Sequence, residues 1–252
     1  MVHFVGAGPG AEDLITVRGL KLLGQADIII YAGSLVNPAL LEHAKEGCRI
    51  YNSAYMTLQE VTAVMEEAEG EGLTTVRLHT GDSSIYGAVR EQMDELDRKK
   101  IAYDVCPGVS SFCGAAASLR AEYTLPEVSQ TIIITRAEGR TPVPERESLK
   151  ALAAHQSTMI LFLSSGLARK VKADLLEGGL SPETPVAVVY KATWPEEKIV
   201  RTTLDELPET MEKEQIRKTA LIIVGRILEG EYAKSKLYDP AFTTEYRKGT
   251  KQ

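Results

Sequence analysis

Three short segments carry residue types that could bind a ligand, and each follows an apolar stretch. They are the glycine loop Gly6–Gly10, the segment Thr80–Gly87 and the segment Pro107–Ser111. Open α/β sheets bind ligands beyond the carboxyl ends of their strands. If the apolar stretches are parallel strands, the three segments lie at one edge of a sheet and form a binding site there.

The glycine loop is similar to a dinucleotide-binding pattern, GxGxxG, but departs from it at two positions. The third glycine would fall at position 11, where the chain has Ala11. Pro9 removes a backbone N–H, and backbone N–H groups are what hold a pyrophosphate. Three interpretations stay open: a tight turn that allows close packing, a loop lining another ligand, or a dinucleotide site.

The polar residues of the other two segments also have alternative interpretations. Asp82 could accept hydrogen bonds from a ligand hydroxyl or ammonium, or Asp82 or Ser83 could cap a following helix. Taken alone, the third segment is a turn followed by a serine cap. Ser110 and Ser111 lack the GxSxG pattern of a hydrolase nucleophile, so a hydrolase is not expected.

The elements that must position these segments alternate in the first half between strand and helix. One helix should begin after Thr16, one at the capping box Thr57–Glu60, and one should run from Ile85 to about Lys99. With strands between them, this order predicts a mostly parallel sheet with helices on both faces. The expected strands are 2–5, 27–31, 74–79 and 103–106.

The second half carries a further set of strands, and the last of them follow one another closely. Part of this second sheet should therefore be antiparallel. The expected strands are 130–135, 158–163, 185–189, 199–203 and 220–224. We expect an N-terminal α/β domain at 1–108, a C-terminal α/β domain at 109–230 and a polar tail at 231–252.

Composition narrows the class of protein. The 252 residues are 44% hydrophobic and 25% charged, which is ordinary for a globular protein. No apolar run reaches the roughly 20 residues of a membrane span, and the start lacks a signal-peptide pattern, so we expect a cytoplasmic protein. The net charge of −6 argues against nonspecific nucleic-acid binding. Three cysteines without CxxC spacing and four scattered histidines predict no protein-built metal site.

Taken together, the motifs resemble those of the tetrapyrrole methylase family over roughly residues 2 to 228. They are VGAGPG, a threonine-led helix, DIIIY, GDxxxYG, PGxS and a final strand at 220–226. The family's GDP triplet is Gly81-Asp82-Ser83 here, a departure that concerns the stiffness of the loop. The resemblance implies an α/β fold of two domains, with a mostly parallel N-terminal sheet, a mixed C-terminal sheet and the active site in a trough between them.

The resemblance also implies a cofactor, S-adenosylmethionine (SAM), with S-adenosylhomocysteine as product, a tetrapyrrole substrate and a homodimer. In the family the glycine loop faces the macrocycle, so Gly8 is expected at the substrate, as is Tyr86. Arg136 and Arg140 are expected to hold the substrate's carboxylates. No residue is identified as a general base. The positions that match the family's cofactor contacts are Pro9, Thr80, Gly81, Asp82, Ile85, Ser110, Ser111, Leu163, Ala192, Thr219 and Ala220.

Finer features resemble the branch of the family that methylates C-11 of precorrin-4 or cobalt-precorrin-4 in cobalamin synthesis. These are YAGSLV at 31–36, TLPEVSQ at 124–130 and TRAEGRTP at 135–142. A methylase acting on another precorrin position or on uroporphyrinogen III is the alternative within the family. Outside it, the rivals are a noncatalytic tetrapyrrole carrier and a nicotinamide oxidoreductase, for which Asp27 would have to supply the ribose carboxylate.

Overall fold

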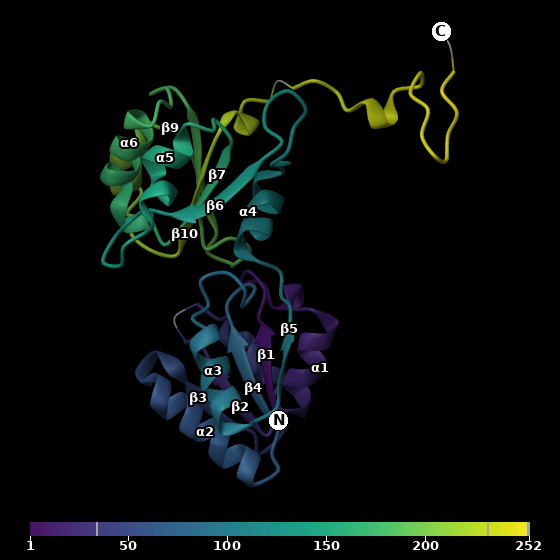
Figure 1. Ribbon diagram of the computed structural model, residues 1–252, viewed down its shortest axis with the longest axis vertical. Coiled ribbons are helices and arrows are strands. Elements are labelled where there is room, and N and C mark those ends of the chain that lie inside the picture. Colours follow the sequence, from purple (N-terminus) through teal and green to yellow (C-terminus); the bar gives the residue numbers. More distant parts are fainter. Residues whose placement is uncertain (34, 231, 251–252) are drawn as a thin grey trace. The chain divides into compact units, whose positions relative to one another are not determined.

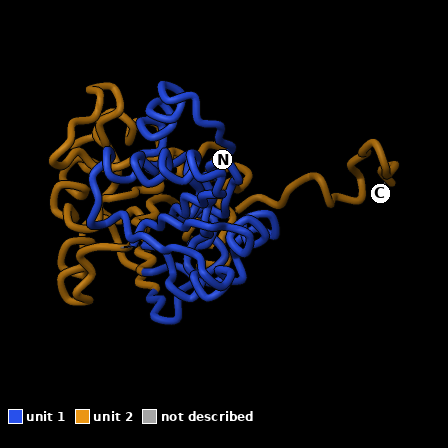
Figure 2. The backbone as a smooth tube through the Cα atoms, turned by 90° about the horizontal axis from the view of Figure 1, so that it is seen from below, with its two compact units in different colours: residues 1–118, 191–198 blue, residues 119–190, 199–252 orange. Residues whose placement is uncertain are grey.

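The computed structural model describes residues 1–33, 35–230 and 232–250. Ser34, inside the 31–36 motif, and residues 231 and 251–252 of the predicted tail lie outside the described residues. The chain has two five-stranded sheets (Figure 1). It divides into two compact units, 1–118 with 191–198 and 119–190 with 199–252 (Figure 2). The predicted domain boundaries at 108 and 230 stay predictions.

The first sheet is parallel throughout, with strand order β3-β2-β4-β1-β5. Gly6 lies opposite His79 of β4, and Val5 lies opposite Cys106 of β5. Strands β4, β1 and β5 therefore end together. The loops that follow them must therefore meet at the same edge. The strands are β1 Val2–Gly6, β2 Ile28–Tyr31, β3 Arg49–Asn52, β4 Thr75–His79 and β5 Tyr103–Cys106.

Helices cover both faces of this sheet, as the sequence predicted (Figure 1). The strands bury alternate side chains against α1 on one face and against α2 and α3 on the other. Phe4 and Met65 are fully buried in the second cluster, and each such side chain contributes about 1.5–3 kcal/mol. Thr16 caps α1, and the capping box at Thr57 opens α2. These helices are α1 Val17–Gln25, α2 Leu58–Gly70 and α3 Arg90–Lys99, and a further helix, α4 Ser111–Leu119, follows β5 in the chain.

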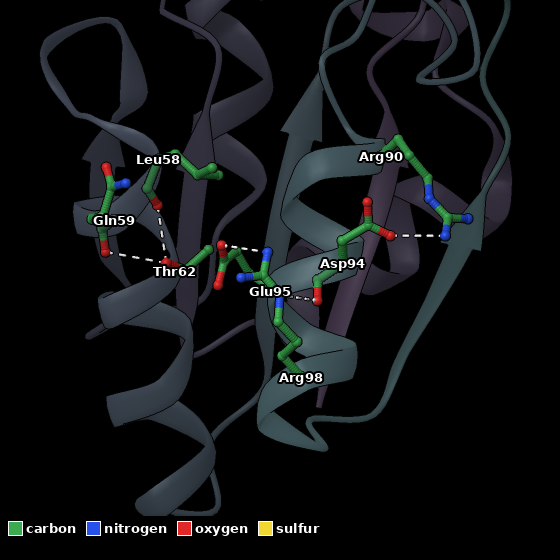
Figure 3. A network of polar contacts seen from close by, with 7 residues as sticks. All are labelled: Leu58, Gln59, Thr62, Arg90, Asp94, Glu95 and Arg98. Carbon is green, nitrogen blue, oxygen red and sulfur yellow. Dashed lines mark hydrogen bonds and ion pairs between the residues drawn. The ribbon is translucent and has the colours of Figure 1, made fainter.

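Helix α3 differs from the prediction because it begins at Arg90, not at Ile85. Tyr86 (φ 53°) and Ala88 (φ 49°) have left-handed backbone conformations, which a right-handed helix cannot contain. On the exposed side of α3, two ion pairs each join residues about one helical turn apart, Arg90 with Asp94 (2.8 Å) and Arg98 with Glu95 (2.7 Å) (Figure 3).

The second sheet is mixed, which confirms the prediction, and has the order β6-β7-β10-β8-β9. Strand β10 runs antiparallel to β7 and β8, and β6 is parallel to β7. Three helices pack on it: α5 Leu149–Ala153, α6 Ala168–Glu177 and α7 Leu207–Lys213. The strands are β6 Ile132–Arg136, β7 Thr158–Phe162, β8 Pro185–Tyr190, β9 Lys198–Thr203 and β10 Ala220–Val224.

The remaining regular segments are short 3₁₀ helices, and the last of them lies in the polar tail. Tyr238 (80% exposed) and Tyr246 (93% exposed) show that the tail's aromatic side chains are not packed in a core. None of the described helices is both long enough and apolar enough for a membrane span. The 3₁₀ helices are Glu12–Leu14, Pro38–His43, Ser53–Tyr55, Glu145–Glu147, Ser165–Leu167, Arg226–Leu228 and Lys236–Tyr238.

Candidate functional site

The first unit brings the three predicted segments together at the carboxyl edge of its sheet. The Gly8 N–H donates to the Gly81 carbonyl (3.2 Å), and the Gly81 N–H donates back to the Gly8 carbonyl (2.9 Å). The Ala7 N–H donates to the His79 carbonyl (2.6 Å). The glycine loop and the Thr80–Gly87 segment therefore continue to pair after their strands have ended.

Glycine is required here by close approach of three backbones. A Cβ on Gly6 would lie 2.6 Å from the Gly108 Cα, and a Cβ on Gly108 would lie 2.2 Å from the Gly81 carbonyl oxygen. Real Cβ atoms do not approach other atoms so closely. Gly81 has a left-handed backbone (φ +61°), which glycine adopts without strain. The contacts between the loops thus depend on three glycines from three separate segments.

The Asp82 carboxylate links the second loop to the third. One oxygen accepts hydrogen bonds from the Ser84 N–H (2.9 Å) and the Ser84 hydroxyl, and the other accepts from the Gly108 N–H (2.8 Å). Partial burial would raise the pKa of Asp82, but the hydrogen bonds from Ser84 and Gly108 outweigh it and lower the pKa. The ionised carboxylate braces the loops. Ser84 was not predicted as a site residue, although Asp-x-Ser is a turn pattern that indicates such a contact.

A buried arginine supports the left-handed segment of the second loop. Arg77 is 5% exposed and donates to Gln92 Oε1 (2.9 Å) and to the Ile30 carbonyl (3.1 Å). The Gln92 amide in turn donates to the Ala88 carbonyl (2.9 Å). Burial lowers the pKa of Arg77 to about 10, so the guanidinium stays charged at neutral pH. This chain of contacts fixes the backbone just after Tyr86.

The predicted residues of these loops differ in exposure. Tyr86 is 46% exposed and borders an open groove of about 740 Å³, lined also by Val89, Met93 and Val105. Ser110 is buried, and its carbonyl accepts the first hydrogen bonds at the start of α4. The hydroxyl oxygen of Thr80 is buried and has no hydrogen-bond partner among the described residues. An unsatisfied buried hydroxyl is costly, so this atom is available to a ligand.

The same geometry disfavours a dinucleotide. The N–H groups of Ala7, Gly8 and Ala11 all donate within the protein, the last to the Thr193 hydroxyl, and Pro9 has none. They cannot also cradle a pyrophosphate. Asp27 lies before β2, at the amino edge of the sheet, where it pairs with Lys45 (2.6 Å). Its carboxylate therefore cannot hold a ribose at the carboxyl edge.

The second unit brings the predicted residues Leu163, Thr219 and Ala220 to one edge of its own sheet. Leu163 follows β7, and Thr219 precedes the antiparallel β10, so both lie at that edge. Leu163 (φ 52°, 65% exposed) and Thr219 (φ 56°) have left-handed backbones, a conformation that clusters at functional sites. The Ser165 hydroxyl donates to the carbonyl of Ala220 (2.9 Å) and fixes the start of β10.

The two predicted arginines have different surroundings. The Arg136 guanidinium, at the end of β6, donates to the carbonyls of Thr141 (3.1 Å) and Pro142 (2.7 Å). It closes the loop that contains Arg140, whose side chain is exposed. Arg136 therefore shapes this loop, and Arg140 is the cation that the loop presents to solvent.

Comparison with known proteins agrees with this arrangement. Residues 1–208 match the family model "Tetrapyrrole (Corrin/Porphyrin) Methylases". The chain belongs to the tetrapyrrole methylase family. The matched range contains predicted site residues of both units, such as Gly81 and Leu163.

Relatives within the tetrapyrrole methylases are similar over almost their full length. The chain is 58% identical to a cobalt-precorrin-4 C(11)-methyltransferase of Methanocaldococcus jannaschii, covering 100% of this chain and 97% of the relative. It is 45% identical to a precorrin-4 C(11)-methyltransferase of a Sinorhizobium species, covering 98% of each.

Solved structures of tetrapyrrole methylases have the same fold. A cobalt-precorrin-4 methyltransferase superposes with a TM-score of 0.88 at 51% identity, covering 90% of this chain and 95% of the other. A uroporphyrin-III C-methyltransferase of Thermus thermophilus, complexed with S-adenosylhomocysteine, gives 0.75 at 25% identity, covering 90% and 92%. The predicted two-sheet tetrapyrrole methylase fold is confirmed.

Proposed function

We propose that this protein transfers the methyl group of SAM to C-11 of cobalt-precorrin-4 or precorrin-4 in cobalamin biosynthesis. The observation that carries the proposal is 58% identity, over the whole chain, with a cobalt-precorrin-4 C(11)-methyltransferase. Identity is lower, 45%, with a relative named for the cobalt-free substrate. This order favours the cobalt-containing substrate.

The residues present suit SAM better than a nucleotide with phosphates. The N–H groups of Ala7, Gly8 and Ala11 are already bonded within the protein, and the buried Thr80 hydroxyl can satisfy a polar atom of the cofactor. SAM supplies a methyl group activated by its sulfonium. We assign the cofactor contacts to two groups of residues, Pro9, Thr80, Gly81, Asp82, Ile85, Ser110, Ser111 and Ala192 in the first unit and Leu163, Thr219 and Ala220 in the second.

The chain's own contribution to the reaction is orientation. An in-line displacement needs the nucleophilic ring carbon held against the methyl group, and well-oriented reactants reach effective molarities of roughly 10⁵–10⁸ M. Loops fixed by the glycine contacts and by the Asp82 brace provide a rigid surface for this purpose. Gly8 and Tyr86 are proposed to face the macrocycle.

Ligand binding tests the proposal directly. We expect the purified protein to bind S-adenosylhomocysteine in titration calorimetry and to give no heat with NAD. Incubation with labelled SAM should transfer label to precorrin-4, cobalt-precorrin-4 or both, and not to uroporphyrinogen III. Binding of NAD without S-adenosylhomocysteine would contradict the methylase proposal, and label in uroporphyrinogen III alone would contradict the substrate.

Arg140 should affect the tetrapyrrole and not the cofactor. Replacing it with alanine removes a charge-assisted hydrogen bond to a substrate carboxylate, worth about 1.5–3 kcal/mol, so the substrate dissociation constant should rise roughly tenfold to hundredfold. Arg136→Ala should raise it too, because the loop loses the donor to Thr141 and Pro142. Affinity for S-adenosylhomocysteine should stay nearly constant in both variants.

Arg98→Ala is the matched control, since Arg98 is an exposed arginine of α3 paired with Glu95 (Figure 3). Substrate affinity should not change in it. Normal substrate binding by Arg140→Ala at low salt would show that Arg140 is an ordinary surface charge.

Two further properties remain part of the proposal. The family resemblance supports a homodimer, which light scattering during gel filtration would test. A cytoplasmic location suits an enzyme of small-molecule biosynthesis, and cell fractionation would test it.

A further inference from the structure

The segment 191–198 lies between two strands of the second sheet, yet it packs within the first unit (Figure 2). It contacts the glycine loop across more than 180 residues of sequence, through Thr193 and Trp194. The Ala11 N–H donates to the hydroxyl oxygen of Thr193 (3.0 Å), 182 residues further along the chain. The Trp194 indole N–H donates to the Pro9 carbonyl (3.2 Å).

Packing makes this contact close. A Cβ on Gly10 would lie 2.1 Å from Cδ1 of Trp194, so the indole edge rests directly on the loop backbone. On Gly114 of α4, a Cβ would lie 2.8 Å from Cβ of Pro9 and 3.1 Å from Cγ2 of Thr193. Pro9 is thus held between helix α4 and the 191–198 segment, and two glycines make the space for it.

The segment is itself rigidly built. Glu197 accepts hydrogen bonds from the Thr193 N–H (2.6 Å) and from the Ser118 hydroxyl (2.5 Å). The Lys191 ammonium lies 5.1 Å from the centre of the Trp194 ring. Thr193 keeps a left-handed backbone (φ 68°), which is rare for a β-branched residue and costs free energy. In this strained conformation the Thr193 hydroxyl accepts the hydrogen bond from the Ala11 N–H.

We infer that Thr193 and Trp194 are positioning residues for methyl transfer, which set the backbone of Pro9–Ala11 where the loop meets cofactor and macrocycle. The inference rests on the proposed function, in which Pro9 and Gly8 contact those ligands. A third side chain completes the arrangement, since the Asn37 amide donates to the Gly10 carbonyl (2.9 Å). Side chains distant in sequence therefore form hydrogen bonds with the Pro9 carbonyl, the Gly10 carbonyl and the Ala11 N–H.

Three threonine variants test the role of the hydroxyl. Thr193→Val keeps the shape and β-branching but leaves the Ala11 N–H without its acceptor, whereas Thr193→Ser keeps the acceptor. With both substrates saturating, we expect kcat to fall about tenfold to hundredfold in Thr193→Val, because small misplacements cost that much. Thr193→Ser should restore most of it. The fall in kcat should exceed the rise in the KM for SAM, whereas a general loss of structure would raise that KM strongly as well.

Thr62→Val is the matched control, because Thr62 is a buried threonine of α2 whose hydroxyl donates to the carbonyls of Leu58 and Gln59 in the same helix (Figure 3). Its kcat should be unchanged. If Thr193→Val does not fold, Trp194→Phe decides, since it removes the donor to Pro9 together with part of the ring that packs on Gly10, and it should lower kcat roughly fivefold.

The outcomes separate the two proposals. If Thr193→Val folds and has the kcat of the unaltered protein, the positioning role is overturned and the methylase function stands. If Thr193→Val does not fold, an unaltered kcat in Trp194→Phe has the same consequence. Absence of S-adenosylhomocysteine binding and of methyl transfer in the unaltered protein overturns the proposed function, and the positioning role with it.

Discussion

Replacing Gly108 with alanine is expected to lower the affinity for S-adenosylhomocysteine about tenfold to hundredfold, or ~1.4–2.8 kcal/mol of binding free energy. The added Cβ would lie 2.2 Å from the Gly81 carbonyl oxygen and 2.7 Å from the Gly6 Cα, so at least two loops must move. The displacement would also lengthen the bond from the Gly108 N–H to Asp82. Titration calorimetry measures the effect.

Stability should fall in the same variant, by about 1–3 kcal/mol, as for other overpacked sites. In a chain of this length that lowers Tm by roughly 2–4 °C per kcal/mol. Gly70→Ala is the control, because a Cβ there, at the end of α2, meets nothing within 4 Å. It should bind as the unaltered protein does and be equally stable or more so. Unchanged affinity in Gly108→Ala would mean that this edge does not bind the cofactor.

The second large effect concerns pH and His79. Burial, followed by the charge of Arg77, lowers the pKa of His79 from 6.5 to about 3. Between pH 6.5 and about pH 3, this histidine is protonated in the unfolded chain and neutral in the folded protein. The contribution of His79 to the unfolding free energy should therefore be nearly constant well above pH 6.5 and fall as the pH drops through that value, by up to about 1.4 kcal/mol per pH unit. From pH 7.5 to pH 5 the loss is about 2 kcal/mol.

His79→Phe isolates this contribution, since the variant cannot take up the proton. The ring is 5% exposed, lies 6.5 Å from that of Phe4, and has a buried Nε2 without a partner among the described residues. An apolar ring suits that environment. Urea unfolding at both pH values should show about 2 kcal/mol less acid sensitivity than in the unaltered protein. His155→Phe, at an exposed position, should keep the full dependence. Equal acid sensitivity in His79→Phe and the unaltered protein would contradict the assignment.

Local pattern predicted most of the elements, and its failures have physical causes. Continuous apolar stretches such as Ile28–Tyr31 and caps such as Thr16 and Thr57 are local signals, and the structure has the corresponding strand and helices. Strand β3 was missed because Arg49–Asn52 is a half-exposed edge strand without an apolar run. The start of α3 was misplaced because no local pattern showed the left-handed Tyr86 and Ala88.

The site was harder to predict because its contacts are not local. That Gly6, Gly81 and Gly108 touch follows from the strand order β4-β1-β5, which periodicity does not reveal. The motif resemblance identified the loops without indicating that the Asp82 carboxylate joins two of them. Nothing near Ala11 indicated a partner at Thr193, and the single signal was an isolated tryptophan in a turn between two strands.

That tryptophan has a practical consequence. Trp194 is the only one in the sequence, and its indole N–H is bonded to the Pro9 carbonyl. Light absorbed at the red edge of the protein spectrum is therefore emitted from one place, beside the glycine loop, with the ammonium of Lys191 5.1 Å from the ring. The emission of the unlabelled protein can follow the arrival of a ligand at this loop in real time. A stopped-flow instrument could resolve the order in which cofactor and macrocycle bind, without attaching a dye.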